Sequence, residues 1–437
     1  MEPAGLQVAA TEGLNARTFA PLTHVALVRH LNLLRHPWYG AAMPVPSPQR
    51  RTAFAVGCTA HIVQDGLSTA INVLLPILAQ TFGLSYAQVG LLRGIKSLTQ
   101  ALFEVNSGWL AERAGEARLI AIGLALFGVG YAALSIAPGV IAIALCLAVV
   151  GVGTALHHAP SSALIVAAYS EQGRSGALGL HNASGDFGKL AFTGGVSLAT
   201  GAGLAWQGIS LIYGIGVLLT ATALMLVTRT LRAQRTEAQN VAAPEDSVKG
   251  WGILNWRAFA ALLAVTGVDT IMQSAVLLFV AFLMLAKGLP LYIATAATVV
   301  LLAGGVFGKA GCGYLAERLG VRRAFMLIQA LTALGLVAIV LAPNWLALAL
   351  LLPLGAVTQG SSSVTYGFAA DLIHPAKMAR GYALLYASGA FAAAGGPFVF
   401  GMIADRFGIE TAIYGIAACA VLAALPIFLL PVRRSPA

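Results

Sequence analysis

Eight ionisable side chains stand inside segments that are otherwise long runs of apolar residues. Four are acidic and four are basic: Asp65, Arg93, Lys96, Glu104, Asp186, Lys189, Asp269 and Lys309. A charged group at membrane depth is costly unless it lines a cavity or pairs with an opposite charge. The equal numbers of acids and bases therefore predict a largely self-neutralising internal network. Such a network can exchange protons, bind ions, or simply hold helices in register as structural ion pairs.

Asp65 is the first candidate for proton coupling. His61 lies one helical turn before it on the same face and could modulate its protonation. A carboxyl group in a partly dry cavity suits the uptake and release of a coupled proton. The alternative for Asp65 is a polar contact that packs helices together. Glu104 and Asp186 are further coupling candidates, and we expect Glu104 to approach Lys309, its counterpart in the second half of the chain.

Polar side chains at helical spacing mark candidate substrate contacts. Asn182, Asp186 and Lys189 form one stripe on an apolar segment, and Asp269 and Gln273 are one turn apart. The substrate-binding candidates are Arg93, Lys96, His157, His158, His181, Asn182, Lys189, Asp269, Gln273, Lys309, Gln359 and Tyr366. The basic members suit an anion, because a cation attracts it strongly at low dielectric constant. Two alternatives stay open: a structural ion pair for Asp186 with Lys189, and a position near the surface for Arg93.

The membrane histidines do not predict a metal site. His157 and His158 are neighbours, and adjacent residues of a continuous helix point about 100° apart. We therefore expect neither a metal nor a cofactor, and favour a proton relay or substrate hydrogen bonding for His61, His157, His158 and His181. Ser161 and Ser162 beside His158 are the one hint of an enzyme, but serines next to a helical proline usually bond to the backbone. An enzyme or a non-transporting sensor is thus a remote alternative.

The composition is that of a membrane protein with many spans. Hydrophobic residues make up 58% and charged residues 10% of the chain, against about 45–50% and 25% in soluble domains. Twelve apolar segments come close to the roughly 20 residues that a bilayer requires. They cover residues 52–82, 86–111, 117–137, 139–168, 175–204, 206–228, 257–286, 290–316, 322–342, 345–372, 379–404 and 409–431.

A charged turn occurs twice and divides these segments into two halves. It reads GWLAERAGEAR over 108–118 and GYLAERLGVRR over 313–323, and Asp65 repeats as Asp269 at a matching offset. Self-similarity at a fixed period indicates a duplicated architecture. We predict an all-α membrane protein with twelve transmembrane helices in two pseudo-symmetric six-helix halves. The predicted parts are a poorly ordered cytoplasmic extension (1–50), the first half (51–228), a cytoplasmic linker (229–256) and the second half (257–437).

Basic residues indicate the orientation. The expected outer loops carry Lys287 and Arg406, whereas the inner segments carry most of the arginines and lysines. This asymmetry places both termini in the cytoplasm. The net charge of +10 thus reflects topology and does not predict a nucleic-acid partner. The run Ala404-Asp405-Arg406-x-Gly408 echoes the charged turn on the outer side and is expected to be ordinary turn chemistry.

The repeated turn resembles the signature loop of the major facilitator superfamily. The first half resembles the fosmidomycin-resistance branch of drug exporters in AHIVQDG around Asp65, in GVG over 151–153, and in His158, Pro160 and Phe187-Gly188. The resemblance implies alternating access in a monomer of the cell (inner or plasma) membrane. The residues it implies for gating, by clasping helix ends, are Gly108, Glu112, Arg113, Gly115, Arg118, Gly313, Glu317, Arg318, Gly320 and Arg322.

The resemblance implies export of a small toxic compound in exchange for protons, with a phosphonate-like anion as the substrate class. A Gly-x-x-x-x-Gly-Lys-Ser/Thr nucleotide-binding motif is absent from the sequence, so the proton gradient is the expected energy source. The several intramembrane cations depart from what the branch implies and leave the substrate open. The alternative is uptake of a small organic or inorganic anion by proton symport, since the same residues would serve both directions.

Overall fold

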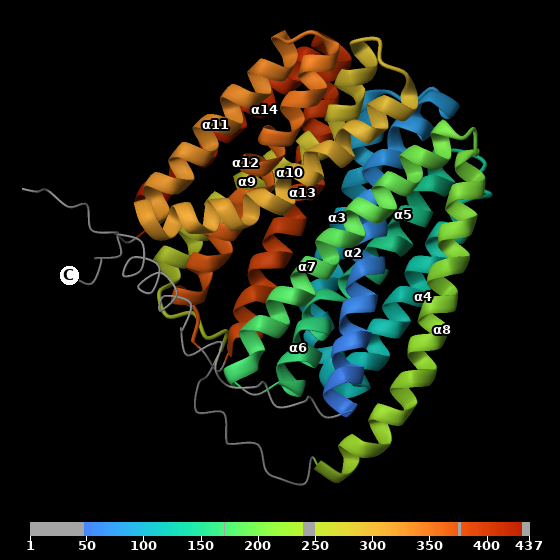
Figure 1. Ribbon diagram of the computed structural model, residues 1–437, viewed down its shortest axis with the longest axis vertical. Coiled ribbons are helices and arrows are strands. Elements are labelled where there is room, and N and C mark those ends of the chain that lie inside the picture. Colours follow the sequence, from blue (N-terminus) through green and yellow to red (C-terminus); the bar gives the residue numbers. More distant parts are fainter. Residues whose placement is uncertain (1–47, 170, 239–249, 375–376, 431–437) are drawn as a thin grey trace, which may run out of the picture. The chain divides into compact units, whose positions relative to one another are not determined.

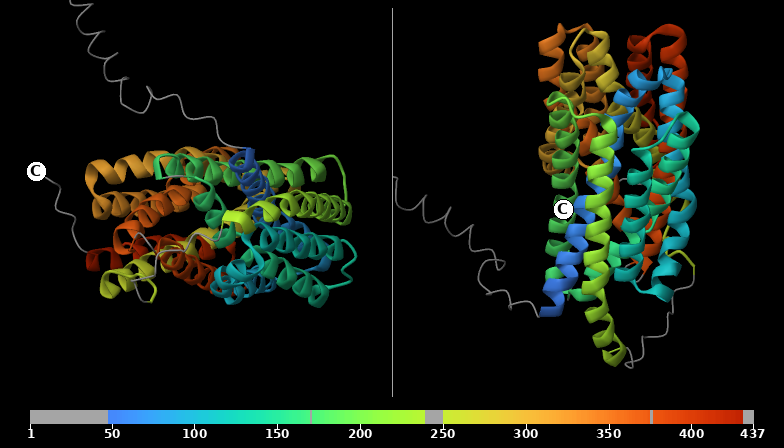
Figure 2. Two further views of the ribbon diagram at one scale, coloured as in Figure 1. Left: turned by 90° about the horizontal axis from the view of Figure 1, so that it is seen from below. Right: turned by 90° about the vertical axis from the view of Figure 1, so that its right-hand side faces the viewer.

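The computed structural model describes residues 48–430 except 170, 239–249 and 375–376. The described chain folds into long helices that run side by side (Figures 1 and 2). The first half contains α2 (Pro48–Phe82), α3 (Tyr86–Ala114), α4 (Glu116–Leu134), α5 (Val140–Ala155), α6 (His158–Ala168), α7 (Glu171–Gly201) and α8 (Trp206–Ala238). The second contains α9 (Trp256–Ala286), α10 (Leu291–Leu319), α11 (Val321–Leu341), α12 (Asn344–Leu372), α13 (Met378–Phe407), α14 (Ile409–Ala423) and the 3-10 turn η2 (Pro426–Leu429).

The predicted twelve-span helical architecture is confirmed. Ten segments of the described chain are long and apolar enough to cross a membrane, with α5 and part of α6 counted as one. The other two crossings are α3 and α7, which carry five of the eight intramembrane charges and are less apolar for that reason. The polar chemistry is therefore concentrated on two helices of the first half.

One predicted span is interrupted. The segment 139–168 forms two helices, because α5 ends at Ala155 and α6 begins at His158. Pro160 explains the break: it has no N–H to donate, and its ring would clash with the carbonyl of Leu156 in a continuous helix. In the first turn of α6 the missing donor costs little. The break changes the direction of the side chains on either side of it.

The two halves meet along α3 with α13 and along α7 with α10. Glycines permit the close approach of α3 and α13. A Cβ added at Gly90 would overlap the backbone of Pro397, and one added at Gly401 would overlap the backbone of Tyr86. Such small residues let two helix backbones come together in a membrane. The halves are thus closely packed at the end of the bundle where α3 begins and α13 ends.

Asp405 at the end of α13 binds the start of α3, a contact that the expectation of an ordinary turn there did not include. Its carboxylate accepts hydrogen bonds from the backbone N–H groups of Tyr86 (2.7 Å) and Ala87 (2.9 Å) and from Ser85 Oγ (2.8 Å). The next N–H, of Gln88, donates to Ser85 Oγ, and the Ser85 N–H donates to Gln88 Oε1. All four unpaired donors at the start of α3 are therefore satisfied, two of them by the other half of the molecule.

Candidate functional site

A chain of ion pairs runs from α2 through α7 to α10 and so crosses between the halves. Lys189 Nζ lies 3.1 Å from Asp65 Oδ2 and 3.1 Å from Asp186 Oδ1. Lys309 Nζ in turn donates to both carboxylate oxygens of Asp186 at 2.6 Å. Two carboxylates and two ammonium groups alternate, so the chain is neutral when all four are ionised. This arrangement confirms the predicted self-neutralising network for these four residues.

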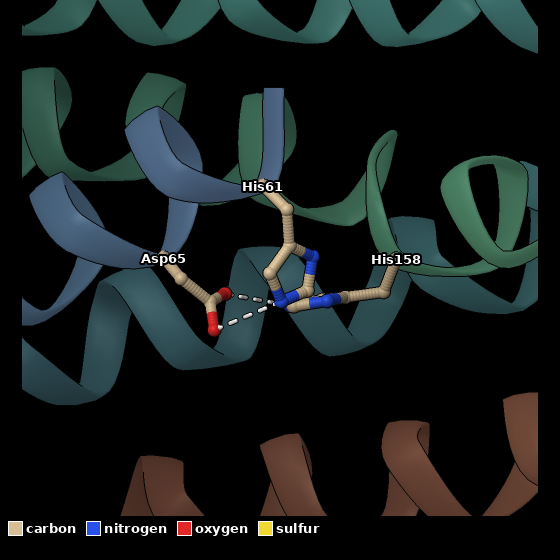
Figure 3. Close-up of side chains that lie close together, drawn as sticks. All are labelled: His61, Asp65 and His158. Carbon is tan, nitrogen blue, oxygen red and sulfur yellow. Dashed lines mark ion pairs between the residues drawn. The ribbon is translucent and has the colours of Figure 1, made fainter. Parts of the chain in front are cut away.

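A histidine cluster adjoins the Asp65 end of this chain. His61 Nε2 lies 3.3 Å from Asp65 Oδ2, and His158 Nε2 lies 3.8 Å from Asp65 Oδ1. Figure 3 shows the three side chains converging, with His61 and Asp65 on α2 and His158 at the start of α6. On its other side His61 Nδ1 is 3.3 Å from His157 Nε2, and its ring centre is 4.2 Å from that of His181. His61 thus lies at the centre of a cluster of four imidazoles.

His157 and His158 make different contacts: His157 Nε2 lies 3.3 Å from His61 Nδ1, whereas His158 Nε2 lies 3.8 Å from Asp65 Oδ1. The two histidines do not belong to one continuous helix, because Leu156 and His157 lie between the end of α5 and the start of α6. Both rings lie beside His61, with centroid distances of 5.3 and 5.9 Å. Gly185 on α7 leaves the space for this ring, because a Cβ there would overlap the His61 imidazole. The helix break and one glycine together create the cluster.

The charged residues of α3 hydrogen-bond to neutral partners. Arg93 Nε donates to Asn72 Oδ1 (2.9 Å) and its Nη1 to Ser97 Oγ, so the guanidinium points into the bundle rather than toward the surface. Lys96 Nζ is buried and donates to Ser68 Oγ (2.6 Å) and Gln100 Oε1 (3.0 Å). These partners on α2 and α3 were not predicted from the sequence, although each is a polar residue in an apolar span.

Glu104 does not approach Lys309, and that expectation is wrong. Glu104 accepts a hydrogen bond from Gln100 Nε2 (3.0 Å) on its own helix, while Lys309 binds Asp186. The repeat aligned the two residues correctly in sequence. However, α10 packs against α7 of the first half, whereas α3 packs against α13, so Lys309 finds its partner on α7 and not on α3.

Asp269, the repeat counterpart of Asp65, sits among neutral donors. Its Oδ1 accepts from Gln329 Nε2 (2.6 Å), and its Oδ2 accepts from Gln273 Nε2 (2.7 Å) and Ser361 Oγ (2.8 Å). The predicted pairing of Asp269 with Gln273 on one face is confirmed. Gln329 was not predicted, although a buried glutamine in the apolar segment 322–342 was a visible signal. The equivalent carboxylates of the two halves therefore have different partners: Asp65 pairs with Lys189, whereas Asp269 accepts hydrogen bonds from neutral side chains.

A small polar pocket opens between the halves. Asp186, Lys189, Lys309 and Gln359 line it, together with apolar side chains of α10. The Nε2 of Gln359 is buried and has no hydrogen-bond partner among the described residues, so this side chain of the pocket lining holds an unsatisfied donor. The structure thus brings together three residues proposed for substrate and one proposed for coupling.

Nine of the twelve predicted substrate residues do not line this pocket, and Asn182 and Tyr366 are two of them. Asn182 has an exposed side chain. The ring of Tyr366 packs against Tyr386 at 5.4 Å between centroids. Tyr386 also stacks on His158 at 6.0 Å and was not predicted. It connects α13 of the second half to the histidine cluster of the first.

The two signature turns have matching backbones. Gly115 and Gly320 take positive φ angles of 84° and 78° between one helix and the next, which favours glycine at both positions. Arg322 donates to the carbonyls of Phe428 and Leu430 and so binds the end of η2. Arg318 lies over the ring of Tyr314, 4.7 Å from its centroid.

The other predicted gating residues lie around the two signature turns, and their role in gating stays a prediction. Arg113, Arg118 and Glu317 are exposed, Gly313 is partly exposed, and the surroundings of Gly108 and Glu112 lie outside what the structure describes. The predicted extension lies almost wholly in the undescribed residues 1–47, and the core of the linker lies in 239–249.

Comparison with known proteins gives consistent results. A sequence profile described as Major Facilitator Superfamily matches residues 57–311 and 262–437. An uncharacterized MFS-type transporter, YfnC of Bacillus subtilis (strain 168), is 26% identical over 102 residues; the match covers 23% of this chain and 25% of the relative.

Two crystal structures of a bacterial homolog to the human lysosomal transporter Spinster resemble the fold. Both are inward-facing, one unoccupied and one occupied, with TM-scores of 0.72 and 0.71. Each is 17% identical, and each match covers 88% of this chain and 97% of the other. At this identity the likeness concerns the fold alone.

Proposed function

The chain belongs to the major facilitator superfamily and is a membrane transporter, not an enzyme, and from this premise we propose that it carries a small anionic compound coupled to protons. The substrate binds in the pocket lined by Asp186, Lys189, Lys309 and Gln359, and Asp65 takes the proton. Alternating access exposes the pocket to each side in turn. The observation that carries the proposal is the ion-pair chain, which joins the coupling carboxylate to the pocket between the halves.

Protonation of Asp65 would change the charge of the pocket. Lys189 divides its contacts between Asp65 and Asp186. When Asp65 is protonated and neutral, Asp186 is the remaining carboxylate partner of Lys189. The ion-pair chain then carries one net positive charge. Lys189 then competes with Lys309 for the same carboxylate, which weakens a contact between the halves. The proton at one end therefore affects both the charge of the pocket and the interface that must open.

We propose export as the direction, following the resemblance of AHIVQDG and the 151–162 segment to drug exporters. The charge balance favours the second candidate, uptake by proton symport. An anion binds better to a chain that has gained a proton, and by linkage the proton binds better when the anion is present. Proton and anion would then travel together, whereas exchange requires that they compete.

Everted membrane vesicles distinguish proton exchange from proton symport. No pH gradient is imposed, and a dye reports the internal pH. Phosphonate drugs and small carboxylates are added outside, one at a time. Exchange makes the interior alkaline as substrate enters, and symport makes it acid. Asp65→Asn should abolish either response, while Glu410→Gln, an exposed carboxylate at an end of the bundle, should leave it intact. An unchanged response in Asp65→Asn would refute the coupling role, and no response to any anion would refute the substrate class.

Orientation and assembly also belong to the proposal. The basic residues of the inner segments support both termini in the cytoplasm of a cell whose inner or plasma membrane holds the protein. Each half contributes one side of the pocket within a single chain, so we propose a monomer as the working unit.

A further inference from the structure

We propose that His61, Asp65 and His158 form a binding site for a divalent transition-metal ion, such as Co²⁺, Ni²⁺ or Zn²⁺. The site lies in the first half of the molecule, where α2 faces the break between α5 and α6 (Figure 3). It is separate from the pocket between the halves but shares Asp65 with the ion-pair chain.

The three side chains already have nearly the separation that a metal requires. Their ligand atoms all lie within 4.8 Å of one another, with 3.3 Å between His61 Nε2 and Asp65 Oδ2 and 3.8 Å between His158 Nε2 and Asp65 Oδ1. Ligands about 2.0–2.2 Å from a tetrahedral ion are roughly 3.3–3.6 Å apart. Small side-chain rotations would therefore close the site. Two imidazoles and a carboxylate suit transition metals rather than Mg²⁺ or Ca²⁺.

The surroundings of His61 support this role. A histidine ligand normally uses its second ring nitrogen to donate to a neighbour, which fixes the ring. His61 Nδ1 lies 3.3 Å from the Nε2 of His157, which is almost fully buried at 1% exposure. Gly185 leaves space for the ring on its other face. The ring of His61 is thus held with its Nε2 directed at Asp65.

Lys189 is the group that opposes metal binding. Its Nζ lies 3.1 Å from Asp65 Oδ2, so an incoming ion and the ammonium group compete for one carboxylate. Lys189 has a second partner in Asp186 at 3.1 Å and can retain that pair when Asp65 turns to the metal. The competition makes a specific prediction: removal of the lysine charge strengthens metal binding, whereas removal of a ligand weakens it.

The test measures Co²⁺ binding to the purified full-length protein in detergent, without a polyhistidine tag, by equilibrium dialysis and visible absorption. The native protein should bind one Co²⁺ per chain at this site. His61→Ala and His158→Ala should each lose about tenfold or more in affinity, and His157→Ala about tenfold through its neighbour. Lys189→Gln should gain affinity. His374→Ala, which removes a histidine outside the cluster, should change nothing.

Two results would overturn the proposal. One is Co²⁺ affinity that is the same in His61→Ala and His158→Ala as in the native protein. The other is no gain in a Lys189→Gln variant that elutes as a folded monodisperse peak. Because this binding is measured without any transport, it stands or falls independently of the proposed proton-coupled anion transport.

Discussion

Removal of the Asp405 carboxylate is expected to open the bundle at the end where α3 begins. Asp405→Ala deletes the acceptor of two backbone N–H groups and of the Ser85 hydroxyl. These donors belong to the first half of the chain and the acceptor to the second. The contact therefore exists only in the closed arrangement, in which the halves are together at this end. Its loss destabilises that arrangement and leaves the open one unchanged.

The magnitude follows from the geometry. Loss of a side-chain cap costs about 0.5–2 kcal/mol, and a negative charge at a helix N-terminus adds about 0.3–1 kcal/mol when exposed. Because Asp405 is exposed to solvent, water replaces part of each hydrogen bond after the substitution. We expect a net shift of about 1–2 kcal/mol, which corresponds to roughly a 5–30-fold change in the equilibrium between closed and open arrangements.

Electron–electron distance measurements between spin labels at Gln80 and Thr411 would report this equilibrium. Both positions are exposed, one in each half, and lie near the turns at 83–85 and 408. The four native cysteines are replaced first. Asp405→Ala should enrich the longer distance, Asp405→Asn should do so less because one acceptor oxygen remains, and Glu410→Ala should match the native protein. Equal distance distributions in all four proteins would refute the reasoning.

Two further substitutions test the packing of the sites. Gly185→Ala places a Cβ where the His61 ring now lies and should lower the free energy of unfolding by about 1–3 kcal/mol. Thermal unfolding in detergent measures this change. Gly176→Ala is the control, because its added Cβ meets no neighbouring atom, and it should not destabilise the protein. Asp269→Asn keeps one acceptor oxygen but turns an amide N–H₂ toward neighbouring donors, so it should lower the unfolding temperature, and an unchanged temperature would contradict the assigned hydrogen bonds.

Local patterns in the sequence were sufficient for the architecture. Each predicted span contains one long helix, or two at 139–168, because a bilayer imposes a minimum length and leaves backbone groups no partner except the helix itself. The duplicated turn predicted the two halves, and positive φ at Gly115 and Gly320 confirms that both copies make the same corner. The contact of His61 with Asp65 was also predictable, since both lie on one face of one helix.

Contacts between helices were decided by the tertiary structure. The repeat aligned Glu104 with Lys309, but which helices meet depends on how α7 and α10 pack, and Lys309 consequently binds Asp186. His157 and His158 reach one cluster because Pro160 breaks the span, which helical spacing alone could not describe. The sequence predicted only a turn at Asp405, whereas in the structure its carboxylate caps α3 of the other half. The sequence determined which side chains are polar within the membrane and which helix carries each, whereas their partners depend on packing between segments far apart in the chain.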